Sequence, residues 1–343
     1  MQASCLYHSN FSNRLVAVAG SLAWILVLLT APQSIVTGDD RIAAVSWSEV
    51  AALAADPVVT VDEPAVIFDP AAQPIPPLPP AMITAAAPRD AWTWQTLPEG
   101  LLWHSYMAGP HEPRISTVLF SEHDGGAFWD ATLGGRVGLL RYGSSDAKHP
   151  EGWQWDLEGA VITRLDLYNS EDVESNDFRF GTELTKALGA WSLKFGYFHI
   201  SSHVGDEYME RNPTFERINY VTESLVLGAS YQAYESLRLY GETAFAFKMS
   251  GGARPWQFQT GFEFVPAPKS LKWGGPFSAM NLDIREAVGY SPSLTAQMGW
   301  QIPGSQSGRR LRWGAQYTNG HSSQFEFFQR KEQTIGGGIW FDY

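Results

Sequence analysis

The chain of 343 residues carries 36 acidic and 24 basic side chains, which give a net charge of -12 at neutral pH. This acidic balance, with no run of basic residues, excludes a nucleic-acid-binding protein. The 32 glycines, 14 tryptophans, 13 tyrosines and 19 phenylalanines favour an aromatic-rich β structure, either one large domain or two smaller ones.

The N-terminal segment has the pattern of a signal peptide. Arg14 precedes the apolar run Leu15–Leu29, and Val36–Gly38 supplies small residues for cleavage after Gly38. We therefore predict a signal peptide over residues 1–38. The alternative is an uncleaved anchor, for which the apolar run is short. The only cysteine, Cys5, precedes this run, so the exported chain would contain no disulfide or thiolate-bound metal.

Two segments of different character follow the predicted cleavage site. Residues 39–96 are rich in alanine, proline and acid, with Ile75–Pro80 at their middle, and predict a disordered periplasmic spacer. Residues 97–113 are turn-rich and contain His104 and His111. We expect them to form an ordered lead-in or plug before the first strand.

From residue 114 onward, apolar and polar side chains alternate as in β-strands. Trp153, Trp155 and Leu157, for example, alternate with Gln154 and Asp156. A soluble sandwich and a membrane barrel both show this pattern. The strands are about ten residues long, the chain is exported, and the last strand ends in an aromatic residue. These features predict an all-β, antiparallel outer-membrane barrel over residues 114–343.

The alternation predicts about twelve strands, an even number as in single-chain bacterial barrels. Tight connections at 188–190 and 233–236 suit periplasmic turns, whereas 168–176 and 204–216 suit the outside. The expected strands lie near 114–123, 128–142, 153–167, 177–187, 191–203, 217–233, 237–248, 256–265, 277–287, 292–302, 309–319 and 331–343.

Charged side chains on the inward faces of these strands would crowd the lumen of the barrel. Unpaired charges at this density would be costly, so we expect them to pair across strands and to leave a narrow conduit or none. These residues are Asp130, Arg136, Asp156, Glu158, Arg164, Arg179, Glu183, Lys194, Arg238, Glu242, Glu263, Asp283 and Arg285.

The segment Phe198–Tyr208 gathers two histidines, two serines and two carboxylates at the end of one predicted strand. The two-residue period of a strand places His199 and Ser201 on the same face as Leu193, Phe195 and Tyr197, which we expect to face lipid. A bulge at 197–198 would instead turn the pair into the lumen. The simplest alternative is a strand end followed by an exposed polar loop.

This segment resembles the hallmark of a family of exported bacterial proteins of unknown function. The family pattern is aromatic-His-x-Ser-Ser-His-x-Gly-Asp-Glu-aromatic, which residues 198–208 fit throughout, and the lead-in at 97–113 is also similar. The resemblance covers about residues 97–343 and implies no activity. His199–Ser202 is also similar to the His-x-Ser-Asn segment of outer-membrane phospholipase A and lipid A deacylase, except that Ser202 replaces the asparagine.

The first functional hypothesis is a hydrolase of acyl esters in outer-leaflet lipids. Ser201 would be the nucleophile and His199 its general base, with Glu223 on the following strand as the acid that orients the imidazole. Asp206 and Glu207 are alternatives for the acid, or could hold a divalent cation such as calcium. Ser202 and His203 complete the motif. His199 and His203 lie about 13 Å apart along a strand, too far to share one ion.

Two other hypotheses need no catalysis. The barrel could be a narrow pore or transporter, or a structural envelope protein, with the motif as a loop anchor. In each case we predict a protein of the bacterial outer membrane, with membrane lipids and the barrel-assembly machinery as partners. The sequence contains no pattern for a nucleotide, haem or flavin cofactor.

Overall fold

The computed structural model describes residues 91–266, 273–305 and 307–343, and within these ranges the regular secondary structure is almost entirely β-strand. Four short helical segments occur: η1 (Leu167–Asn169), α3 (Asp206–Arg211), η2 (Glu286–Val288) and η3 (Phe325–Phe327). The strands are β1 (Thr93–Thr96), β2 (Ile115–Glu122), β3 (Ala127–Gly143), β4 (Gly152–Asp166), β5 (Asp172–Leu188), β6 (Trp191–Val204), β7 (Val221–Tyr234), β8 (Leu237–Ser250), β9 (Trp256–Phe264), β10 (Gly275–Arg285), β11 (Pro292–Pro303), β12 (Arg310–His321) and β13 (Lys331–Asp342).

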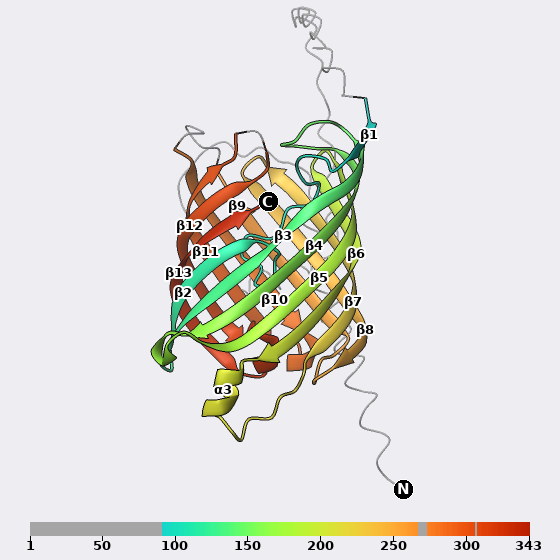
Figure 1. Cartoon of the computed structure of the whole chain (residues 1–343). Helices are drawn as coiled ribbons and strands as arrows, with labels where there is room; N and C mark the ends of the chain where they lie inside the picture. The colour runs from blue at the N-terminus through green and yellow to red at the C-terminus, as the bar shows by residue number, and fades with distance from the viewer. Residues whose placement is uncertain (1–90, 267–272, 306) are drawn as a thin grey trace, which may run out of the picture. The chain divides into compact units, whose positions relative to one another are not determined.

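Strands β2 to β13 form a closed antiparallel barrel of twelve strands (Figure 1). Each pairs with its neighbours in the chain, and β13 closes the ring by pairing with β2 from Thr334↔Glu122 to Phe341↔Ile115. Closure leaves no open sheet edge between the first and last strands of the ring, which is the condition for a sheet to span a membrane. The predicted fold class is confirmed.

Side chains alternate between the two faces of the wall, as β6 illustrates. Leu193 and Phe195 are 44% and 55% exposed, whereas Lys194 between them is 2% exposed. The outer face is therefore apolar and the inner face charged, the reverse of a soluble protein and the normal arrangement of a membrane barrel.

The two ends of the barrel differ in their connections. Two-residue turns join β5 to β6 and β7 to β8 at one end, where the connections 144–151 and 304–309 are longer; the segments after β6 and β12 lie at the other end and include α3 and η3. Figure 1 places α3 at one end, called here the α3 end, and β1 at the other. Short turns are typical of the periplasmic end and longer loops of the external end.

The lumen is filled by residues 97–114, called here the luminal segment. Trp103 and Tyr106 are fully buried. The Tyr106 hydroxyl donates to Glu242 (2.9 Å), and the ring of Tyr106 stacks on that of Tyr240 with their centres 3.8 Å apart. The backbone carbonyl of Met107 accepts from Arg114 and Arg312 at 2.7 and 3.2 Å. These contacts anchor the segment to the inner wall.

The η3 loop, residues 322–330, fills the lumen at the α3 end. Phe325 and Phe328 are each 2% exposed and belong to a buried apolar cluster with Phe198, Ile200 and Tyr220. The luminal segment reaches this loop, because the ring of His111 stacks on Phe325 with 4.3 Å between centres. Both segments therefore occupy the lumen and meet inside it.

The expected pairing of luminal charges is confirmed. Arg136 bonds Glu158 and Glu183, while Lys194 lies 3.2 Å from Glu183 and 2.8 Å from Glu242. Arg164 joins Asp130 and Glu332 at 2.8 Å each, Arg179 bonds Glu158, and Arg238 bonds Glu263. Arg285 differs from this expectation, because it pairs with Asp283 of its own strand. Among the thirteen predicted residues, Asp156 alone forms no ion pair; it accepts hydrogen bonds from Gln154 and Thr185 instead.

The folded part begins earlier than the sequence pattern indicates. Thr93–Thr96 lies in the predicted spacer but forms β1, which pairs with β3 from Thr93↔Gly143 to Thr96↔Leu140. The Gln95 side chain adds bonds to the carbonyls of Gly143 and Ser144. The predicted signal peptide at 1–38 and the rest of the spacer, to residue 90, lie outside the described residues. In the described ranges, no helix has the length and hydropathy to cross a membrane.

Candidate functional site

The end of β6 presents His199 and Ser201 on the outer face. The pairing of β6 runs without a bulge, from Leu188↔Trp191 to Ser175↔Val204 with β5 and from Trp191↔Tyr231 to Ser201↔Val221 with β7. The two-residue period is therefore unbroken from Leu193 to Ser201. The alternative in which a bulge turns the pair into the lumen does not occur.

His199 lies directly opposite Glu223 on β7. Its Nδ1 is 3.2 Å from Glu223 Oε2, and the Tyr197 hydroxyl donates to the same oxygen. The His199 and Glu223 side chains are 32% and 18% exposed, so the pair lies at the surface. A carboxylate on a membrane-facing surface needs such partners, because an unpaired one would be costly.

This contact decides which nitrogen of His199 can accept a proton. When Nδ1–H donates to Glu223, the lone pair of the neutral ring is at Nε2. The same division of roles occurs in Ser-His-Asp sites, where the carboxylate orients the imidazole and stabilises its protonated form. The His199–Glu223 contact thus has the geometry of the base–acid contact in such sites.

Ser201 lies two residues along the same face, about 6.7 Å from His199 in strand rise. Its side chain is partly exposed. Within the described part of the chain, no hydrogen bond joins Ser201 to His199, and proton transfer requires one of about 2.6–3.2 Å. Such contacts are often long in ligand-free enzymes and shorten when substrate binds. The structure brings the three residues to one patch without forming the nucleophile–base contact.

Apolar side chains and one cation surround this patch. Phe178 lies opposite Ser201 on β5, and Phe180 opposite His199; they are 41% and 52% exposed. On the other side, Lys248 of β8 lies opposite Glu223 and is exposed. The sequence analysis did not identify Tyr197 or Lys248. Tyr197 could have been placed beside the site from the sequence, because it lies two residues before His199 on the same face of the strand. Lys248 could not, because its position depends on how β7 pairs with β8.

Ser202 faces the lumen and has a different environment from Ser201. It is fully buried, its hydroxyl donates to Asp177 on β5, and it accepts the backbone N–H of Glu326 at 3.0 Å. Asp177 also accepts from the backbone of Phe325 at 3.2 Å. Ser202 therefore attaches the η3 loop to the wall and has no access to the outer face.

The remaining motif residues form the turn into α3. His203 faces outward with its ring 5.9 Å from that of Phe178, and Asp206 pairs with Arg217 at 2.8 Å. Glu207 lies in the first turn of α3. Tyr208 packs edge-on against Phe327, 5.1 Å between centres, and burial raises the pKa of its hydroxyl. The described residues contain no cluster of three or more His, Cys, Asp or Glu side chains that could hold a metal ion.

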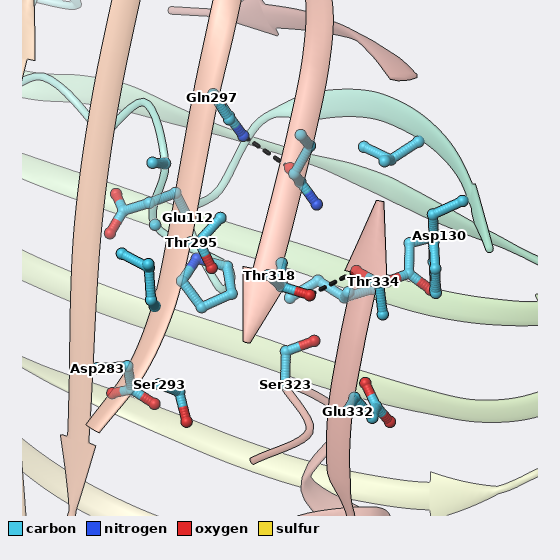
Figure 2. A pocket seen from close by; sticks show the side chains of 18 of the residues that line it. Glu112, Asp130, Asp283, Ser293, Thr295, Gln297, Thr318, Ser323, Glu332 and Thr334 are labelled. Carbon is cyan, nitrogen blue, oxygen red and sulfur yellow. Dashed lines mark hydrogen bonds between the residues drawn. The ribbon is translucent and has the colours of Figure 1, made fainter. Parts of the chain in front are cut away.

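The lumen contains a second candidate site, a cavity of about 80 Å³ beside the luminal segment. Figure 2 shows Glu112, Asp130, Thr295 and Glu332 around it, with hydrogen bonds from Gln297 to Gln316 and between Thr318 and Thr334. A cavity of this size holds a few water molecules. It is too small to serve as a conduit for solutes in this conformation.

Known proteins resemble this chain in two ways, through one family model and through distant solved structures. A family described as "Protein of unknown function (DUF1207)" matches residues 56–343, and no curated protein matches the chain. Outer membrane phospholipase A from Escherichia coli is similar, with 10% identity and a TM-score of 0.43, over 67% of this chain and 93% of that one. The Salmonella typhi outer membrane phospholipase dimer with bound calcium (11%, 0.42, 67% and 91%) and a porin from Rh. blastica (10%, 0.30, 67% and 98%) are also similar. These likenesses concern the barrel alone.

Proposed function

Since the chain belongs to the DUF1207 family of proteins of unknown function, we propose from its own geometry that it is an outer-membrane hydrolase of lipid acyl esters. The observation that carries the proposal is the Glu223–His199 contact on the outer face beside Ser201. Buried motif residues such as Ser202 hold the contents of the lumen in place. His199 and Glu223 lie on the apolar outer surface, where they stabilise no part of the lumen.

The position of the patch suits a lipid substrate. His199 and Ser201 lie five and three residues from the end of β6 at Val204, at the α3 end of the barrel. If the end with short turns is periplasmic, the α3 end faces outward. The patch then lies near the outer rim, where the ester bonds of outer-leaflet lipids are located.

The chemistry follows from the roles of the three side chains. His199 Nε2 removes the proton of Ser201 Oγ as that oxygen attacks the acyl carbonyl, while Glu223 stabilises the resulting imidazolium. The imidazolium then protonates the leaving alcohol oxygen, leaving an acyl ester on Ser201. A water molecule, deprotonated by His199, releases the fatty acid and restores the serine.

Release of fatty acid from phospholipid or lipopolysaccharide by purified protein tests this proposal. Ser201→Ala should reduce release to background, because the nucleophile is lost. Ser121→Ala is the matched control, since Ser121 is an exposed outward serine near the α3 end of β2, and it should retain wild-type activity. Assays in calcium and in chelator show whether a cation contributes. Equal release by wild type and Ser201→Ala, or none by wild type in any condition, would contradict the proposal.

The filled lumen favours a structural barrel as the second candidate. The luminal segment and the η3 loop contact the wall through many hydrogen bonds, among them Met107 N–H to Glu263 at 2.8 Å and Phe325 N–H to Asp177 at 3.2 Å. Breaking them to open a pore would expose buried charges. If Ser201 is not needed for hydrolysis, a structural role of the barrel is therefore favoured over a transport role.

A further inference from the structure

A groove of about 420 Å³ indents the outer face of the barrel beside the candidate site. Its floor is formed by the glycines of β3 and β4, which present no side chain to the membrane. Arg136 and Glu158 border it, but their side chains turn into the lumen, where they pair with each other. The residues that shape it from outside are Gly135, Val137, Leu157, Gly159, Phe180 and Tyr343.

The groove exists because β3 lacks a neighbour on one side along part of its length. β2 pairs with β3 only as far as Ile115↔Leu133, and β1 pairs with it only from Leu140 onward. The Tyr343 ring covers part of the gap, since a Cβ at Gly135 would lie 2.9 Å from it. The wall therefore lacks one strand beside β3 between Leu133 and Leu140, and its outer surface is indented there.

The strand register connects the groove to the candidate site through Phe180, which lines the groove and lies opposite His199. Gly135 lies opposite Gly159, Gly159 opposite Phe180, and Phe180 opposite His199. The three steps between neighbouring strands span roughly 14 Å along the barrel wall. Because the strands are tilted (Figure 1), the row moves away from the α3 end as it passes from β6 to β3.

We propose that this groove binds the acyl chain of the lipid whose ester bond is held at Ser201. The inference rests on the proposed function and defines its substrate class as long-chain acyl esters. An apolar groove on a lipid-facing surface takes a hydrocarbon chain, and its connection to His199 places the carboxyl end of that chain at the reacting serine. The chain would then run from the rim toward the middle of the membrane.

Gly159→Leu fills the groove with little distortion of the wall. A Cβ at Gly159 would meet one atom within 4 Å, the Arg179 carbonyl oxygen at 3.5 Å, which is an ordinary contact. Gly241→Leu is the matched control. Gly241 also faces outward, on β8, and its Cβ would meet one atom, the Gln259 carbonyl oxygen at 4.0 Å. Both variants add the same apolar side chain to the lipid face.

The first readout is the chain-length profile of hydrolysis. Gly159→Leu should lower the rate on long-chain esters by about tenfold or more, since excluding two methylenes has about that effect. It should leave the rate on short-chain esters unchanged, and Gly241→Leu should match wild type on both. The inference is overturned if the two leucine variants have the same profile while Ser201-dependent hydrolysis is intact.

The second readout does not depend on catalysis. In the Ser201→Ala background, a phospholipid with a diazirine near the end of its acyl chain should label residues 134–161 more than the outer face of β8. Gly159→Leu should remove this excess and Gly241→Leu should keep it. If wild type shows no Ser201-dependent hydrolysis, the proposed function fails and this labelling alone decides whether the groove binds a chain. Equal labelling in the two leucine variants would then reject it.

Discussion

Glu223 determines what His199 can do. It accepts from Nδ1 of the imidazole and from the Tyr197 hydroxyl through the same oxygen, Oε2. The carboxylate therefore holds the ring in one tautomer, and Tyr197 holds the carboxylate. Removing the charge of Glu223 without changing its size tests this arrangement directly.

Glu223→Gln should lower the rate of fatty-acid release by at least about 100-fold, because a neutral amide no longer stabilises the imidazolium that forms as Ser201 attacks. Tyr197→Phe removes a single hydrogen bond to the carboxylate and should lower the rate by about fivefold to tenfold. Rates on one lipid substrate at fixed pH measure both effects. A glutamine variant as active as wild type would remove Glu223 from the site.

At the scale of the strand, β6 uses its two faces for different purposes. Ser201 faces the membrane, and the adjacent Ser202 is buried against Asp177 and the backbone of the η3 loop. One residue of register would exchange the two serines. The unbroken pairing with β5 and β7 prevents that exchange.

Ser202→Ala should destabilise the docking of the η3 loop by roughly 1–3 kcal/mol, since Asp177 loses a donor and the Glu326 amide loses its acceptor in a buried site. Hydrogen exchange of the amides at 322–330 should become faster. Ser201→Ala, which removes a hydroxyl from the outer surface, should leave this exchange unchanged. Similar exchange in the two variants would show that Ser202 does not hold the loop.

The parts of this site that could be predicted are those set by local period. Alternation along 191–203 and 217–233 placed His199, Ser201 and Glu223 on one face. The Ser202–Glu326 contact could not be predicted, because it joins the strand to a loop 124 residues away in sequence. β5 begins at Asp172, whereas the pattern suggested 177. The polar residues Glu174–Asn176 have the pattern of a loop, so the start of the strand could not be recognised from the sequence. In the structure Glu174 and Ser175 are buried.

At the scale of the whole molecule, the lumen and the outer face have separate roles. Buried ion pairs brace the inner wall around the luminal segment, and such pairs define one arrangement more than they add stability. The groove also escaped sequence-based prediction, since it arises where β2 ends and β1 begins along β3. The hydrolysis that we propose at the outer surface requires no rearrangement of the packed lumen.

Covalent labelling of Ser201 tests the central claim most directly. A fluorophosphonate with a long alkyl chain reacts with serine hydroxyls that an adjacent base activates. After incubation with folded protein and proteolysis, mass spectrometry should find the adduct on Ser201 and not on Ser121. His199→Ala should abolish the adduct, because the base that removes the hydroxyl proton is lost. An unlabelled Ser201 in wild type, or equal labelling in His199→Ala, would contradict the account.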